Sequence, residues 1–222
     1  MRDQDSEGTI EDEERTVLTA RLTLRRPRTE DAATLAAAID NPRVAMNLVS
    51  VPHPYRRADA EAWIHQARSP SAGRSHVAIR RDEGSLLGAS FLRPSATRPE
   101  GHDLSFWVDE RFWGRGFGTE IAHATIDHAF GADGVCRIWC AVRVTNGPAR
   151  RVAEKCGFQF RDTGMARSLA ARGSVPVEHF VLERRVWQSL KSWGRADGAF
   201  VPGSPGRADG AGSRPLQEEG ER

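Results

Sequence analysis

The sequence predicts a single mixed α/β domain. Short runs in which apolar and polar residues alternate, as in half-buried strands, are interspersed with longer runs whose apolar residues recur at helical spacing. These segments follow one another in the order β-α-α-β-β-β-α-β-α-β-β, with no internal repeat. The chain of 222 residues is long enough for one compact domain with its own core.

The two ends of the chain differ in composition from its middle. Residues 1–15 are acidic and polar, and residues 194–222 are rich in Gly, Pro, Ser and charged side chains. Such compositions bury too little apolar surface to offset the entropy lost on ordering, so we expect both ends to be disordered. The expected folded domain therefore spans residues 16–193.

The first half of the domain is predicted to open with a strand and a helix. Residues 22–24 alternate like a short strand. Thr29 then offers a capping hydroxyl, two acidic residues follow it at the positive end of the helix, and Asn41-Pro42 stops the helix. The remaining expected elements of this half are a helix over 59–67 and strands over 76–80 and 85–92.

The centre of the chain carries the clearest pattern. Over residues 103–109, Leu104, Phe106 and Val108 point to one face of a strand, and Asp103, Ser105 and Trp107 to the other. After a loop, apolar residues recur at helical spacing over 118–130. The remaining expected elements are a strand over 137–144, a helix over 147–156, and strands over 158–160 and 177–184.

Composition excludes several classes of protein. The net charge of +2 is too small to indicate a nucleic-acid binder. No stretch is long and apolar enough to span a bilayer, and residues 1–15 lack the features of a signal peptide, so we expect a cytoplasmic protein without a membrane partner. Cys136, Cys140 and Cys156 lie in apolar stretches without ligand spacing, so we expect buried thiols and no metal site.

A glycine-rich loop, Trp113-Gly-Arg-Gly-Phe-Gly118, lies between a predicted strand and a predicted helix. Glycines at such a junction let backbone N–H groups converge on an anion at the positive end of the helix. A dinucleotide-binding fingerprint would need a glycine where Thr119 stands, and the Gly-Lys-Ser/Thr of a P-loop is absent. Taken alone, the loop is also compatible with a simple flexible connector.

A second motif follows the next predicted strand: Asn146-Gly-Pro-Ala-Arg-Arg-Val-Ala-Glu-Lys-Cys-Gly-Phe158. Together the two motifs resemble the GNAT acetyltransferase superfamily, and within it the RimJ/RimL-like branch. Upstream, Arg21-Leu-Thr-Leu-Arg-Arg-Pro27 and Pro54-Tyr-Arg-Arg-Ala-Asp-Ala60 resemble opening segments of that branch. The resemblance covers residues 18–188. It implies a mostly antiparallel sheet of six to seven strands, splayed at its centre and flanked by about four helices.

The resemblance also implies that the chain uses acetyl-CoA as a co-substrate. Backbone amides of the loop would hold the CoA pyrophosphate, and Arg115 would add a charge. The residues implied in this role are Gly114, Arg115, Gly116, Phe117, Gly118 and Thr119. Trp107 and Val108 would offer backbone groups to the pantetheine arm and the thioester carbonyl where the strands splay. Asn146 would contact the cofactor arm, although a role as helix N-cap explains it equally well.

Acetyl transfer to an amine needs a group that accepts a proton from the ammonium. In this branch a glutamate often lies two residues before a Gly-Tyr or Gly-Phe pair. Ser105-Phe106 matches that pair and places Asp103 at the glutamate position, from which it would act through a water molecule. An exposed acid at a strand end explains Asp103 equally well. Asp109, Glu178 and His179 are weaker candidates.

No familiar proton donor is evident. Many members of the superfamily use a tyrosine near the helix that corresponds to residues 147–156, but Tyr55 is the only tyrosine of this chain. Ala149 replaces the serine that the branch often has in its second motif. A donor is not essential, because a thiol with a pKa of about 8.5 can leave as a thiolate, stabilised by a helix end.

These observations predict an N-acetyltransferase that moves an acetyl group from acetyl-CoA by direct transfer to a primary amine. The acceptor would be a protein N-terminus, such as that of a ribosomal protein, or a small-molecule amine. We expect its choice to depend on loops over 52–55, 93–102 and 165–176. The alternative function is a non-catalytic acyl-CoA-binding sensor or scaffold module. The resemblance is also compatible with a homodimer.

Overall fold

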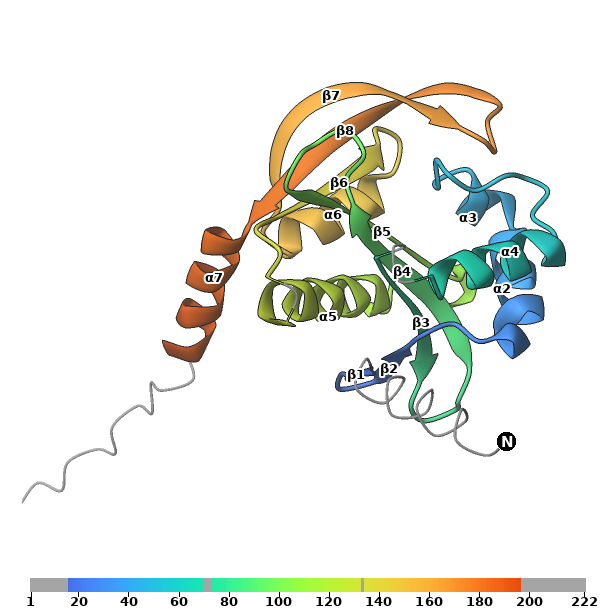
Figure 1. Ribbon diagram of the computed structural model, residues 1–222, viewed down its shortest axis with the longest axis horizontal. Coiled ribbons are helices and arrows are strands. Elements are labelled where there is room, and N and C mark those ends of the chain that lie inside the picture. Colours follow the sequence, from blue (N-terminus) through green and yellow to red (C-terminus); the bar gives the residue numbers. More distant parts are fainter. Residues whose placement is uncertain (1–15, 70–72, 133, 197–222) are drawn as a thin grey trace, which may run out of the picture.

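One mixed sheet organises the computed structural model, which describes residues 16–69, 73–132 and 134–196 (Figure 1). Its strands are β1 (Val17–Leu18), β2 (Leu22–Arg25), β3 (Arg74–Arg80), β4 (Leu86–Pro94), β5 (Gly101–Val108), β6 (Arg137–Arg143), β7 (Gln159–Ser168) and β8 (Gly173–Glu183). They lie in the order β1-β2-β3-β4-β5-β6-β8-β7. Every neighbouring pair is antiparallel except β5 and β6, which are parallel.

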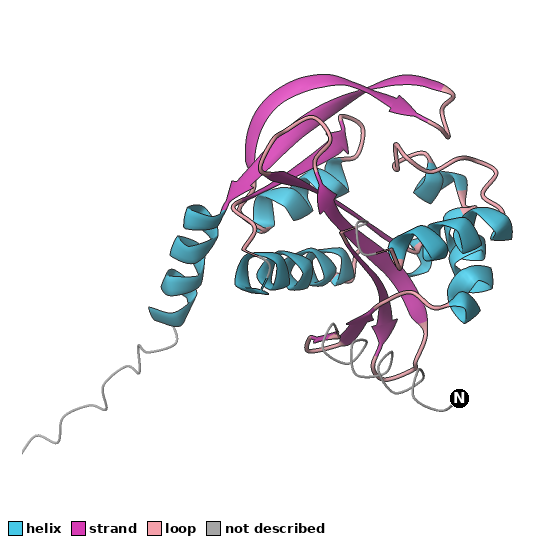
Figure 2. Cartoon of the chain, in the orientation of Figure 1, coloured by secondary structure: helices cyan, strands magenta, loops and turns pink. Residues whose placement is uncertain are grey.

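Helices cover both faces of this sheet (Figure 2). They are α2 (Ala32–Ile39), α3 (Pro42–Ala45), α4 (Arg57–Ala67), α5 (Phe117–Ala132), α6 (Gly147–Lys155) and α7 (Arg184–Ala196), with short 3-10 turns η1 (Thr29–Asp31) and η3 (Glu110–Phe112). α2 and α4 pack on one face, whereas α5 and α6 pack on the other. The helices that join successive strands therefore bury both sides of the central strands.

The alternation along β5 reflects these two layers. Trp107 is 4% exposed and belongs to the apolar cluster under α2 and α4. Leu104 belongs to the cluster under α5 and α6, and Val108 packs with Phe117 at the start of α5. Successive side chains of a strand point to opposite faces, so β5 packs against both helix layers because it has apolar residues on each of its two faces.

The predicted mixed α/β fold is confirmed, with two differences in the number of elements. The sheet has eight strands rather than six to seven, because the two-residue strand β1 pairs with β2 ahead of the first expected strand. The described residues form six α-helices rather than about four, because α3 and α7 were not expected. α3 is a single turn capped by Asn41, the residue that was expected only to stop the preceding helix.

The hairpin of β7 and β8 is much longer than expected. β7 runs over ten residues instead of 158–160, and β8 begins at Gly173. The region 165–176, expected to be an acceptor loop, therefore forms the outer part of a paired hairpin. The expected loop over 93–102 is also shorter than predicted, because β4 ends at Pro94 and β5 begins at Gly101. Most side chains of β7 are exposed on both faces, so the apolar alternation that marks a half-buried strand is missing.

The expected splay at the centre of the sheet is confirmed. β5 and β6 pair only from Gly101 to Asp103 on one strand and from Arg137 to Trp139 on the other. Both strands continue beyond these residues, to Val108 and Arg143. The two parallel strands therefore separate and leave an opening between their carboxyl-terminal halves.

Helix α7 carries the described structure past the expected domain end at residue 193. Trp187 Nε1 donates to Asp127 Oδ1 of α5 at 2.7 Å, and Lys191 Nζ lies 2.5 Å from Asp127 Oδ2. The helix ends at Ala196. The rest of the expected tail, and residues 1–15, lie outside the described residues. Within the described ranges, no helix is long and apolar enough to cross a membrane.

Candidate functional site

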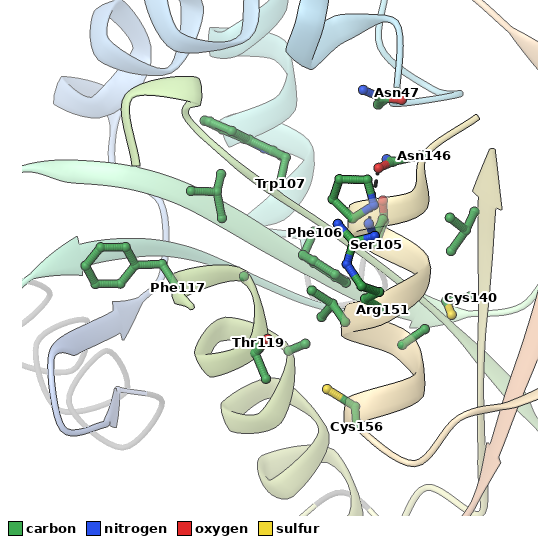
Figure 3. A pocket seen from close by; sticks show the side chains of 18 of the residues that line it. Asn47, Ser105, Phe106, Trp107, Phe117, Thr119, Cys140, Asn146, Arg151 and Cys156 are labelled. Atoms are coloured by element: carbon green, nitrogen blue, oxygen red, sulfur yellow. Dashed lines mark hydrogen bonds between the residues drawn. The ribbon is translucent and has the colours of Figure 1, made fainter. Parts of the chain in front are cut away.

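A cavity of about 550 Å³ occupies the split between β5 and β6 (Figure 3). Its walls come from residues 104–108 of β5, the loop before α5, the first turn of α5, residues 140–142 of β6 and α6. Val44, Asn47 and Leu48 also line it. They belong to residues 41–49, which we call the cover segment. The volume is typical of pockets that bind small molecules and cofactors.

The cover segment is attached to three other parts of the chain. Glu110 accepts from Asn41 Nδ2 at 2.5 Å and forms an ion pair with Arg43. Arg143 Nη1 on β6 donates to the carbonyl of Met46. At the tip of the β7–β8 hairpin, Leu169 N–H donates to the Val49 carbonyl at 3.0 Å. The cover segment is therefore held by contacts from distant parts of the sequence.

Backbone groups of β5 face the cavity. Asp109 N–H donates to the Leu87 carbonyl at 2.8 Å, and hydrogen-bonded pairs alternate along an antiparallel ladder. Trp107, two residues earlier and opposite Ala89, therefore bonds to β4, whereas the N–H and C=O groups of Phe106 and Val108 point toward β6. Because β6 has separated there, these groups face the split.

The structure thus distinguishes the two residues expected to bind the pantetheine arm. Val108 directs its backbone groups into the split, and its carbonyl accepts from Trp113 Nε1 at 2.7 Å. Trp107 lines the cavity, but its backbone N–H and C=O groups pair with β4 and do not face the split. Phe106 presents its backbone groups to the split and was missed. The alternation rule would have found it once the pairing register of β4 and β5 was known.

The glycine-rich loop has the backbone conformation that its sequence requires. Gly114 and Gly116 have φ values of +75° and +81°, a region that favours glycine. A Cβ atom at Gly118 would lie 3.6 Å from the ring of Phe106. The loop and the first turn of α5 line the cavity through Gly114, Gly116, Phe117, Gly118 and Thr119. The unpaired N–H groups at the start of α5 make this wall suited to an anion.

Arg115 differs from its neighbours in the loop. Its guanidinium carbon lies 5.9 Å from the centroid of the Phe112 ring, and the residue is not among those that line the cavity in the described structure. The charge that the resemblance implied at Arg115 therefore lies outside the cavity wall. α6 instead brings Arg151 and Lys155 to the cavity. These two were missed, although a spacing of four residues places both on one face of a helix.

Asn146 caps helix α6. Its Oδ1 accepts from the Ala149 N–H at 3.1 Å, and the residue also lines the cavity. The expected N-cap role is confirmed, and the contact with a cofactor stays a prediction. The cap directs the positive end of a second helix, next to α5, at the same cavity.

Asp103 lies where the split begins. It faces Trp139 across the last pair between β5 and β6. Its Oδ1 is 3.8 Å from Arg98 Nη1, and its side chain is 36% exposed. It is not among the described residues that line the cavity, and the part of the lining that β5 supplies starts one residue later at Leu104. The expectation that this carboxylate accepts a proton through a water molecule stays a prediction.

The weaker acid–base candidates all have partners of their own. Asp109 forms an ion pair with Arg111 at 2.6 Å, and Glu178 forms one with Arg150 of α6. His179 Nδ1 lies 2.5 Å from Asp162 Oδ1. These interactions explain the three residues through local structure.

Two thiols form part of the cavity wall, on β6 and at the end of α6. Cys140 is fully buried, and burial raises its pKa far above the ordinary value. Burial, followed by the nearby Asp127 carboxylate, raises the pKa of Cys156 to about 12. Both side chains therefore stay protonated near neutral pH. Cys136 was expected to be buried but is exposed, because it precedes β6 and has not yet entered the sheet.

Tyr55, the sole tyrosine, is not placed to donate a proton at the cavity. It is 7% exposed within the apolar cluster under α2 and α4, and is not one of the described cavity residues. Burial, with the charge of Asp59, raises its pKa to about 12. Nor do His, Cys, Asp and Glu side chains gather anywhere in the described ranges in a group of three or more able to hold a metal ion.

Comparisons with known proteins agree with this geometry. Residues 21–159 match the model of a family described as the acetyltransferase (GNAT) domain. The chain is 23% identical over 146 residues to the uncharacterized N-acetyltransferase p20 of Bacillus licheniformis, which covers 65% of this chain and 82% of the relative.

Solved structures show the same fold at low sequence identity. The spermidine N-acetyltransferase of Vibrio cholerae, solved with CoA and spermine, has a TM-score of 0.66 at 18% identity, over 77% of this chain and 99% of that one. RimJ of Mycobacterium smegmatis, solved with CoA-disulfide, has a TM-score of 0.63 at 18% identity, over 78% and 90% of the two chains.

Proposed function

The chain belongs to the GNAT acetyltransferase family, and from this premise we propose that it transfers the acetyl group of acetyl-CoA to a primary amine within the cavity between β5 and β6. The observation that carries the proposal is the split itself. One cavity of about 550 Å³ is bordered by the glycine-rich loop, by backbone groups of β5 that face the split, and by the N-terminal ends of α5 and α6.

Each part of acetyl-CoA has a matching part of the cavity wall. The pyrophosphate fits the N–H groups at the start of α5, next to Gly114 and Gly116. The amides of the pantetheine arm fit the backbone groups of Phe106 and Val108, as an added strand would. Arg151 and Lys155 supply positive charge along α6. Two structural neighbours were solved with CoA or its disulfide, which supports this assignment.

We infer that the transfer is direct. The lone pair of the neutral amine attacks the thioester carbonyl, a C–N bond forms, the C–S bond breaks, and the sulfur leaves as a thiolate. The proton that the amine loses passes to a base and on to solvent. An acetyl-cysteine intermediate would need a thiolate in the cavity, but burial raises the pKa of both Cys140 and Cys156.

We propose that the acceptor enters next to the cover segment. This segment closes the cavity on the side that meets the tip of the β7–β8 hairpin. The hairpin tip and the residues after the cover segment belong to the regions expected to select the acceptor. A peptide N-terminus and a small-molecule amine both remain candidates. One structural neighbour is named for spermidine and another is RimJ.

Asp103 is the proposed base, acting through a water molecule. An Asp103→Ala variant should lose kcat while the Kd of acetyl-CoA stays within about twofold. The matched control is Asp82→Ala, which removes an exposed acid from the turn between β3 and β4. An unchanged kcat in Asp103→Ala would exclude Asp103 as the base and leave the cofactor site untouched.

A non-catalytic acyl-CoA-binding module is the second candidate function. The observation that favours it is the position of Asp103, outside the cavity lining and next to Arg98. Release of CoA thiol from acetyl-CoA in the presence of amines separates the two functions. Acetyl-CoA binding without thiol release from any tested peptide or small amine would support the module.

Thermal unfolding with and without acetyl-CoA tests the cofactor assignment directly, with NAD and ATP as controls. A ligand present at about a hundred times its Kd adds about 2.7 kcal/mol to the free energy of unfolding. A shift with acetyl-CoA alone is the expected result. If acetyl-CoA produces no shift, both the transferase and the binding module are excluded.

A further inference from the structure

Arg21 lies outside the cavity, and its side chain contacts the glycine-rich loop that borders the cavity. It follows the turn between β1 and β2, nearly a hundred residues before the loop in sequence. Its Nη1 donates to the carbonyl of Arg115 at 3.0 Å. Its guanidinium carbon lies 4.2 Å from the centroid of the Phe117 ring. A single side chain therefore contacts the loop on both sides of Gly116.

Glu120, in the first turn of α5, holds this guanidinium in place. Arg21 Nε donates to Glu120 Oε2 at 2.7 Å, and the Arg21 N–H donates to Oε1 at 3.0 Å. The Thr19 hydroxyl donates to the same Oε1 at 2.6 Å. Partial burial acts to raise the pKa of Glu120, but these hydrogen bonds outweigh it and lower that pKa, so the carboxylate stays charged.

The contact with Arg115 sets the direction of one peptide group. In a trans peptide the C=O and the following N–H point in opposite directions. Because the Arg115 carbonyl points outward to Arg21, the Gly116 N–H points to the other side of the loop. Gly116 lines the cavity, whereas Arg115 does not. The outward carbonyl thus turns an N–H donor toward the position proposed for the pyrophosphate.

We propose that Arg21, held by Glu120, is a positioning residue that keeps the loop in the conformation that binds the pyrophosphate of acetyl-CoA. This inference rests on the proposed function and adds to it a residue that touches neither the ligand nor the cavity. Arg21 acts through geometry, because the carboxylate of Glu120 neutralises its charge. Its role requires the planar fork of a guanidinium, which reaches two acceptors at once.

The test compares three variants by calorimetric titration with two probes. Arg21→Gln removes the fork, and Arg21→Lys keeps a charge that reaches either Glu120 or the Arg115 carbonyl but not both. Arg81→Gln is the matched control, because the Arg81 guanidinium donates to the carbonyls of Thr19 and Ala20 in the same turn rather than to the glycine-rich loop. The probes are acetyl-CoA and S-acetylpantetheine, which lacks the pyrophosphate.

We expect Arg21→Gln to bind acetyl-CoA roughly tenfold more weakly, the effect of losing one hydrogen bond from a charged donor. Arg21→Lys should fall between Arg21→Gln and the wild type. Arg81→Gln should stay within about twofold of the wild type, as should the affinity of every variant for S-acetylpantetheine. Should Arg21→Gln fail to fold, Arg21→Lys decides the question.

Two results would overturn the inference while leaving the proposed function intact. One is wild-type affinity for acetyl-CoA in both Arg21 variants. The other is an equal loss of affinity in a control: if Arg81→Gln loses as much affinity for acetyl-CoA, the effect comes from a general loosening of the turn. If the Arg21 variants lose as much affinity for S-acetylpantetheine, the effect comes from a general loosening of the cavity. A wild-type protein that fails to bind acetyl-CoA would instead remove the proposed function, and this inference with it.

Discussion

The glycine-loop wall of the cavity and the cover segment across from it are built in different ways. The wall comes from two stretches of chain, 104–119 and 146–156, and presents mainly backbone groups of β5 and the N-terminal ends of α5 and α6. The cover segment is held by side chains and backbone groups from remote positions, namely Glu110, Arg143 and Leu169. A site made of main-chain groups should depend on backbone geometry and close packing. The stability of a cover segment held by side chains should depend on individual hydrogen-bond donors.

The largest expected effect comes from filling the glycine-loop wall. In Gly118→Leu the new side chain starts 3.6 to 3.8 Å from Phe106, Val108 and Val152, so its outer atoms must enter the cavity or displace these neighbours. Such overpacking costs about 1–3 kcal/mol, so the Kd of acetyl-CoA should rise about ten- to a hundredfold. Calorimetric titration measures the change.

Gly118→Ala is the matched control for this substitution. Its Cβ makes ordinary van der Waals contacts, so the affinity for acetyl-CoA should stay within about threefold. Hydrogen exchange in the cover segment should not change in either variant. If Gly118→Leu binds acetyl-CoA as tightly as Gly118→Ala, the cofactor does not occupy the split between β5 and β6.

The same contrast explains which parts of the site the sequence could predict. Gly114, Gly116 and Asn146 carry local requirements, a positive φ or a helix cap, and such requirements appear as residue types at fixed spacing. The central strands are also recognisable in the sequence, because both of their faces pack against apolar clusters and so carry apolar residues. The splay itself was available only through the family resemblance.

What the sequence could not show depends on pairing between distant residues. That Phe106 rather than Trp107 offers its backbone to the split follows from the register of β4 against β5, which no local pattern encodes. The contacts of Arg21 and Arg143 join residues almost a hundred positions apart. β7 is held mainly by its pairing with β8 and exposes most side chains, so it lacks the apolar alternation of a strand.

A smaller effect is expected from loosening the cover segment. Arg143→Gln shortens the side chain that donates to the Met46 carbonyl and leaves that carbonyl without its donor. Losing a hydrogen bond from a charged group costs about 1.5–3 kcal/mol. The hydrogen-bonded amides of Ala45, Met46 and Leu48 should therefore exchange at least about tenfold faster, because local opening becomes easier.

Arg137→Gln controls for a general loss of charge on β6, since the Arg137 guanidinium pairs with Glu183 at 3.5 Å in a largely exposed position, away from the cover segment. It should leave exchange in the cover segment unchanged. In Arg143→Gln the Kd of acetyl-CoA should change by less than about twofold, because the glycine-loop wall does not depend on this contact. A loss of acetyl-CoA affinity as large as that of Gly118→Leu would show that the two walls form one unit.

The smallest effect is expected at the two buried thiols that line the cavity, Cys140 and Cys156. Burial raises the pKa of Cys156 to about 12, so the group gains a thiolate only as the pH approaches that value. From about pH 7 to about pH 10, iodoacetamide should modify the exposed Cys136 and leave Cys140 and Cys156 intact.

Incubation with acetyl-CoA should leave no acetyl adduct on the intact protein. Cys156→Ala should keep kcat within about twofold, because a protonated thiol takes no part in a direct transfer. An acetylated Cys156 would make the transfer a two-step reaction, with the thiol as nucleophile rather than as part of the cavity wall.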